Sequence, residues 1–187
     1  MQEVNSNMIR VYTGPMFANK SYNLIMEYYR NINENKNNII CFKPSKDNRD
    51  KSRIKSRATK MYLEAYVIKD LDEINKYLTP EIDTIIIDEI QFITGDVSEL
   101  LRTSIMNNID IYIAGLDLTS ELKPFGIMPN ILAIADEIYK CESDCKDCND
   151  GARYTYCLVK KEEDILVGNM EYIPLCKECF KKKINNS

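Results

Sequence analysis

Residues 10–29, RVYTGPMFANKSYNLIMEYY, combine a β-rich run, a loop that begins at Gly14 and an amphipathic helix opened by Lys20 and Ser21. Gly14 to Ser21 follows the pattern G-x-x-x-x-G-K-[ST] with one departure, because Asn19 stands where the second glycine is expected. In such a loop, backbone N–H groups and the helix N-terminus surround a β-phosphate. Asparagine is one of the few residues that tolerate positive φ, so the loop can still form. The stretch therefore predicts a phosphate-binding loop.

Every residue of this loop is a candidate contact to ATP or Mg²⁺: Gly14, Pro15, Met16, Phe17, Ala18, Asn19, Lys20 and Ser21. Lys20 would neutralise charge on the β- and γ-phosphates, and Ser21 would bind Mg²⁺. The alternative is a plain strand–turn–helix junction with a lysine that faces solvent.

Apolar, β-rich runs alternate with segments of helical periodicity through the first three quarters of the chain. The apolar runs are Ile9–Thr13, Ile39–Phe42, Thr84–Ile87 and Ile109–Ala114, and the helical segments include Ser21–Tyr29 and Leu71–Leu78. The run that ends at Ile87 is apolar on both faces, as expected for a strand covered on both sides. The alternation predicts an α/β domain, with a P-loop NTPase-like parallel sheet flanked by helices, over residues 1–140.

Two adjacent carboxylates, Asp88 and Glu89, follow the apolar run TIII. If the strand continues, the two side chains point to opposite sides. Asp88 would then face the metal and Glu89 the cleft. The chain contains no histidine, so Glu89 is the best candidate for the base that accepts a proton from an attacking hydroxyl. The alternative is a charged pair that simply marks the end of a strand.

Composition narrows the class of protein. The chain has 187 residues, of which 44% are hydrophobic, and a formal net charge of -4. This length allows a proper core, and the negative charge argues against a nucleic acid as the main partner. No apolar stretch is long enough to cross a bilayer and the N-terminus has no signal-peptide pattern, so we expect a cytoplasmic protein without a membrane partner.

The last part of the chain, residues 141–187, is rich in cysteine and poor in aliphatic residues. Its own hydrophobic core is therefore too small, and it needs a cross-link such as a bound metal to fold. It contains two C-x-x-C pairs, Cys145 with Cys148 and Cys176 with Cys179. Four thiolates at this spacing fill a closed structural zinc site, and the long interval between the pairs leaves room for an inserted loop. Cys141 is an alternative ligand, and free thiols without a metal are the other possibility.

Several segments in register resemble the thymidine kinases of the P-loop, zinc-containing type, from about Met8 to Phe180. They are GPMFANKS, KPSKDNR, KSRATK, IDEIQF, AGLDLTSELKPFG and the two C-x-x-C pairs. The resemblance implies transfer of the γ-phosphoryl group of Mg-ATP to the 5′-hydroxyl of thymidine or deoxyuridine, in nucleotide salvage for DNA synthesis. It also implies that Glu89 is the base, that zinc is structural in a small zinc-ribbon-like domain carrying a lid loop, and that the chain forms a homotetramer.

The resemblance also implies contacts for both substrates. Besides the loop, the ATP and Mg²⁺ contacts are Asp47, Arg49, Arg57, Asp88 and Gln91. The nucleoside contacts are Met16, Phe92, Leu116 and Phe125. The lid contributes Ala152, Tyr154, Thr155, Leu166, Val167, Gly168 and Tyr172.

The chain departs from the family pattern at a few positions near these contacts. Ile90 occupies a small-residue position beside Glu89, Ser120 replaces an aromatic residue, Cys157 replaces a basic one, and the double glycine of the lid is reduced to Gly168 followed by Asn169. Together with Asn19, the changes at Ile90 and Ser120 motivate the alternative of a kinase-derived nucleotide-binding protein with little turnover. A third reading is a zinc-ribbon protein with a nucleic-acid-stimulated ATPase.

Overall fold

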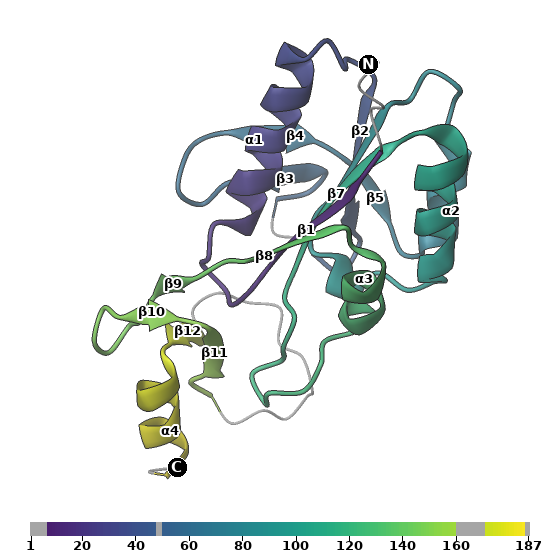
Figure 1. Cartoon of the computed structure of the whole chain (residues 1–187). Helices are drawn as coiled ribbons and strands as arrows, with labels where there is room; N and C mark the ends of the chain where they lie inside the picture. Colours follow the sequence, from purple (N-terminus) through teal and green to yellow (C-terminus); the bar gives the residue numbers. More distant parts are fainter. Residues whose placement is uncertain (1–6, 48–49, 160–170, 186–187) are drawn as a thin grey trace, which may run out of the picture.

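The computed structural model describes residues 7–47, 50–159 and 171–185. Within them, the central element is a six-stranded sheet in which every neighbouring pair is parallel (Figure 1). In spatial order its strands are β5 Tyr66–Ile68, β2 Ile39–Pro44, β6 Thr84–Ile87, β7 Asp110–Gly115, β1 Ile9–Thr13 and β8 Glu137–Lys140. The predicted α/β fold with a parallel sheet flanked by helices is confirmed.

Helices cover both faces of the sheet, as Figure 1 shows. One face carries α1 and a hairpin made of β3 and β4, and the other carries α2, α3 and the 3₁₀ helix η1. Their bounds are α1 Lys20–Asn33, β3 Arg53–Lys55, β4 Tyr62–Glu64, η1 Leu71–Lys76, α2 Val97–Asn107 and α3 Met128–Ile134.

Strand β6 shows why its sequence is apolar throughout. Ile86 packs into the core cluster under α1, whereas Ile85 and Ile87 pack into the cluster under α2 and α3. All four residues of the strand are buried. A central parallel strand covered on both faces requires such a continuous apolar run, because successive side chains enter opposite cores.

The elements differ from the sequence-based prediction at their ends. The segment from Leu71 forms a 3₁₀ helix, and a capping box between Asp70 and Glu73 fixes its start. Strand β2 extends to Pro44, and β7 is displaced by one residue relative to the predicted run. Strand β6 ends at Ile87, so Asp88 and Glu89 lie beyond it.

A smaller C-terminal module, residues 141–159 and 171–185, follows the sheet (Figure 1). It consists of two antiparallel strand pairs and one helix: β9 Ser143–Asp144, β10 Gly151–Ala152, β11 Tyr154–Cys157, β12 Tyr172–Leu175 and α4 Lys177–Asn185. Its buried cluster contains three cysteines beside Ala152, Leu175 and Phe180. Among the described helices, none combines the length and apolar character needed to cross a bilayer.

Candidate active site

The predicted phosphate loop connects β1 to α1 in a conformation that depends on a few special residues. Gly14 has φ 136°, and a Cβ atom there would lie 2.3 Å from the carbonyl oxygen of Cys141. Asn19 adopts the left-handed conformation, with φ 56°, at the N-cap of α1. Phe17 also has positive φ, at 65°. Asn19 therefore adopts the left-handed conformation that the glycine of the motif usually adopts. Two non-glycine residues with positive φ also show that the backbone of the loop is strained.

Lys20 is buried within this loop. Its Nζ donates to the carbonyl oxygens of Gly14, at 3.2 Å, and Pro15, at 2.5 Å. Burial lowers the pKa of Lys20, and the negative charges of Glu89 and Asp88 oppose this shift. The alternative of a solvent-facing lysine is wrong, because the ammonium lies inside the loop and close to both carboxylates.

A hydrogen bond joins the loop to the acidic end of β6. Ser21 Oγ donates to Asp88 Oδ2 at 2.8 Å, and the N–H of Glu89 donates to the other oxygen of Asp88 at 3.0 Å. Burial, followed by the charge of Glu89, raises the pKa of Asp88 to about 7. A serine hydroxyl and a carboxylate in contact, beside further acidic groups, match the ligands that Mg²⁺ takes beside a phosphate chain. A divalent cation there would favour the ionised carboxylate.

Glu89 leaves the strand through a backbone turn. Its φ of 52° is left-handed, and it caps the short 3₁₀ helix η2 Ile90–Phe92. The strand therefore does not continue through the two carboxylates, so strand alternation cannot set the directions of their side chains. Gln91 Nε2 donates to Glu89 Oε2 at 2.5 Å, and Gln91 Oε1 accepts from the N–H of Leu116 at 3.0 Å. Gln91 thus connects Glu89 to the end of β7.

A cavity of about 270 Å³ brings many of the predicted residues together. It is lined by the phosphate loop, Glu89, Leu116 and the segment after β3, which contains Arg57. The guanidinium carbon of Arg57 lies 5.8 Å from the ring centre of Phe17. The loop lysine, the candidate base and a second cation therefore border one space, as phosphoryl transfer requires.

The predicted nucleoside contacts divide between this cavity and a second one. Met16 and Leu116 line the first. Phe92 and Phe125 line the second, of about 420 Å³, with ring centres 5.3 Å apart in an edge-to-face contact. Gln91 lines the second cavity and accepts a hydrogen bond from the N–H of Leu116, which lines the first.

The predicted lid residues have different environments. The hydroxyl oxygen of Thr155 accepts a hydrogen bond from the N–H of Met16 at 3.0 Å. Ala152 is fully buried in the C-terminal module, Tyr154 packs on Phe180 with ring centres 5.5 Å apart, and Tyr172 is buried in β12. Four predicted contacts, Arg49, Leu166, Val167 and Gly168, lie outside the described residues.

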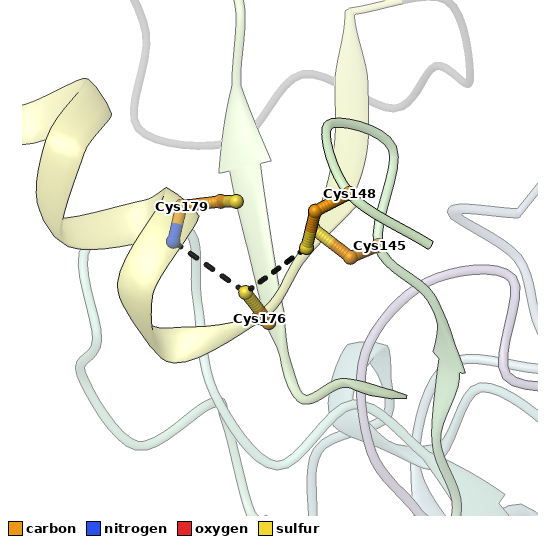
Figure 2. A group of neighbouring side chains, drawn as sticks. All are labelled: Cys145, Cys148, Cys176 and Cys179. Atoms are coloured by element: carbon orange, nitrogen blue, oxygen red, sulfur yellow. Dashed lines mark hydrogen bonds between the residues drawn. The ribbon is translucent and has the colours of Figure 1, made fainter. Parts of the chain in front are cut away.

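The two C-x-x-C pairs converge on one point (Figure 2). The four sulfurs of Cys145, Cys148, Cys176 and Cys179 lie within 4.8 Å of one another, and those of Cys148 and Cys176 are 3.7 Å apart. Tetrahedral zinc with Zn–S bonds of about 2.3 Å places neighbouring sulfurs about 3.8 Å apart. The donor set and its spacing therefore fit zinc. Cys141 is not part of the group, because its sulfur accepts from Asn23 of α1.

Comparison with known proteins agrees with this arrangement. The family model described as thymidine kinase matches residues 7–180, which is most of the chain. The chain belongs to the thymidine kinase family. A thymidine kinase of Pseudothermotoga lettingae is 31% identical over 173 residues, which cover 90% of this chain and 92% of that protein. A thymidine kinase of Bacteroides thetaiotaomicron is 34% identical, and the match covers 92% of this chain and 86% of that protein. A thymidine kinase of Onion yellows phytoplasma is 36% identical, and the match covers 95% of this chain and 88% of that protein.

Ile90, one departure from the thymidine kinase pattern, was expected beside the candidate base Glu89, but its side chain lies in the core. Ile90 is fully buried in the core under α2 and α3. Its Cγ2 lies 2.8 Å from the position that a Cβ atom would take on Gly115. Ile90 therefore points away from the cleft and fills the space beside Gly115, so it does not crowd the carboxylate of Glu89.

Sequence reasoning missed one buried charged residue beside this thymidine kinase site. Lys43, on β2, is 1% exposed, and its ammonium contacts Asp47. The only signal in the sequence is a lysine at the end of the apolar run before the segment that carries Asp47 and Arg49.

Proposed function

We propose that the protein catalyses the phosphorylation of the 5′-hydroxyl of thymidine or deoxyuridine, with Mg-ATP as the phosphoryl donor, in nucleotide salvage for DNA synthesis. The hydrogen bond between Ser21 and Asp88, 2.8 Å long and adjacent to Lys20 and Glu89, carries the proposal. It ties the start of the phosphate-loop helix to the acidic end of β6, which is the pair of elements that must meet around a bound triphosphate.

In the proposed mechanism, N–H groups of the loop and the ammonium of Lys20 bind the phosphate chain. Ser21 and Asp88 would hold Mg²⁺, which would supply positive charge beside the phosphate chain. Glu89 accepts the proton of the 5′-hydroxyl while the oxygen of that hydroxyl forms a bond to the γ-phosphorus. The bond from that phosphorus to the bridging oxygen breaks, and ADP leaves with the electron pair.

The C-terminal module has a separate task in this proposal. Zinc bound by the four cysteines supplies folding free energy to a module with a small core. The module, which we place from residue 141, then presents β11 to the phosphate loop and the lid to the nucleoside. We also expect the homotetramer that the resemblance implies.

The variant Glu89→Gln tests the assignment of the base. It keeps the size of the side chain but cannot take a proton, so we expect kcat to fall about 100- to 10,000-fold while ATP still binds. Unchanged turnover would refute the assignment. A product assay with ATP, Mg²⁺ and a panel of deoxynucleosides identifies the substrate and distinguishes a working kinase from a binding protein with little turnover.

A further inference from the structure

Lys43 is a buried lysine at the carboxyl end of the central sheet. Its strand, β2, pairs with β6 so that Phe42 lies opposite Ile87, and Lys43 therefore reaches the level of Asp88. Cys41 packs into the core cluster under α1, and strand alternation directs Lys43 to the same face. Burying an ammonium group is costly unless it is paired, so the contacts of this side chain need an explanation.

The ammonium of Lys43 contacts two segments, and one of them leads into residues that line the phosphate-loop cavity. It lies 3.3 Å from Asp47 Oδ2 and donates to the carbonyl oxygen of Arg53 at 3.2 Å. Asp47 belongs to the turn after β2, where its N–H donates to the carbonyl oxygen of Pro44. Arg53 begins β3, and the chain continues from there into residues 55–58, which line the cavity.

Asp47 is itself 7% exposed, and it follows a strand that is joined to the end of β6, because the N–H of Asp88 donates to the carbonyl oxygen of Phe42 at 3.0 Å. After burial and the charge of Glu89, the charge of Asp47 contributes to the raised pKa of Asp88. Lys43 therefore places a positive charge beneath a group of carboxylates that would otherwise repel one another. Because Lys43 does not line the cavity, it can act on the reaction only through the groups it holds.

We propose that Lys43 is a positioning residue for phosphoryl transfer, which holds Asp47 beside Asp88 so that the two carboxylates together order the ligands of Mg²⁺. This inference rests on the proposed function. Mg²⁺ in such sites keeps several waters and takes one or two carboxylates, so a second carboxylate near the direct ligand orders the water shell. A positioned carboxylate loses this role when its own partner is removed.

The test compares Lys43→Met, Asp47→Asn and the double variant with the wild type. We expect Lys43→Met to lower kcat and the Mg²⁺ affinity of the ATP complex about 10- to 100-fold, the usual effect of losing an outer-shell partner, with KM for the nucleoside nearly unchanged. The double variant should lose no more than Asp47→Asn alone, because residues that act as one unit are not additive. It also removes both buried charges, so it remains informative if Lys43→Met does not fold.

Lys36→Met is the matched control. Lys36 pairs with the buried carboxylate of Asp110 at the start of β7, which is the end of the sheet opposite Asp88. This variant should lose stability and keep kcat. The proposal is wrong if the losses of Lys43→Met and Asp47→Asn multiply in the double variant, or if Lys43→Met behaves like Lys36→Met. If the wild type phosphorylates no nucleoside, the proposed function fails, and Mg²⁺-dependent ATP binding by calorimetry still decides the role of Lys43.

Discussion

The N–H of Met16 donates a hydrogen bond to the hydroxyl oxygen of Thr155, with 3.0 Å between the two atoms. Met16 belongs to the phosphate loop, and Thr155 to β11 of the C-terminal module. The two residues are far apart in the sequence, so this bond couples the conformation of the loop to the folding of the module. The backbone of Gly14 adds to the same contact, since it lies directly against Cys141.

Replacing Thr155 with valine tests this coupling. Valine keeps the shape but removes the acceptor, so the N–H of Met16 loses this partner. We expect the free energy of unfolding to fall by about 1 kcal/mol and the affinity for ATP to fall with it. Thr155→Ser keeps a hydroxyl and should behave like the wild type. Urea unfolding and calorimetric titration with ATP measure both effects, and equal ATP affinity in the two variants would contradict the coupling.

Loss of zinc should affect the phosphate loop through the same contact. Cys176→Ser removes one of four clustered thiolates, so we expect the bound zinc, measured by elemental mass spectrometry, to fall from one ion per chain and the module to unfold. Because β11 contacts the loop, affinity for ATP should fall as well. Cys157→Ser is the control, since the sulfur of Cys157 contacts the carbonyl oxygen of Val159 instead of the cluster. Full zinc content in Cys176→Ser would argue against a four-cysteine site.

The sequence predicted the features whose signals are local. The loop at Gly14, the carboxylates after β6 and the paired cysteines each depend on neighbouring residues, and the central strands are apolar because both faces are covered. The edge strands β5 and β8 escaped prediction because they are short and half exposed. Tyr66 and Ile138, for example, are 51% and 44% exposed.

Side-chain directions at the end of β6 were harder to predict. The strand ends at Ile87, and Glu89 then turns the chain through a left-handed conformation. A non-glycine residue in that conformation leaves no mark in hydrophobic periodicity, so the burial of Ile90 could not be deduced. The ion pair of Lys43 is likewise a tertiary contact, set by the pairing of β2 with β6.

The raised pKa of Asp88 predicts a stability that depends on pH and on Mg²⁺. Between the ordinary value of 3.8 and about 7, the folded protein binds more protons at this group than the unfolded chain does. Stability therefore falls as the pH rises through this window. Asp88→Asn, which cannot ionise, should raise the melting temperature at pH 8 in Mg²⁺-free buffer and raise it less at pH 5, because most of the window lies above that pH. Mg²⁺ should stabilise the wild type at pH 8 more than this variant. A gain that is equal at both pH values would contradict the prediction.

Gln91 should matter for turnover more than for binding. Its amide connects Glu89 to Leu116, so Gln91→Met keeps most of the volume but removes this hydrogen bond to the carboxylate of the candidate base. We expect kcat to fall up to about 100-fold, with KM for the nucleoside little changed, because misplacing a catalytic group costs rate more than affinity. Steady-state kinetics separate the two constants. A rise in KM alone would show that Gln91 serves substrate binding instead.

Shortening Ile90 should destabilise the fold without improving catalysis. Its side chain fills the core next to Gly115, so Ile90→Ala leaves a cavity and should lower the free energy of unfolding by about 2–5 kcal/mol. If instead the large side chain restricts the carboxylate of Glu89, the same variant should raise kcat. That result would support the alternative of a nucleotide-binding protein with little turnover. Asn19→Gly is the useful companion variant, because φ 56° at Asn19 suits glycine and the change removes no core contact. Urea unfolding measures the stability of both variants, and steady-state kinetics measure their rates. Together they decide whether the departures from the family pattern reduce activity or only change the packing of the core.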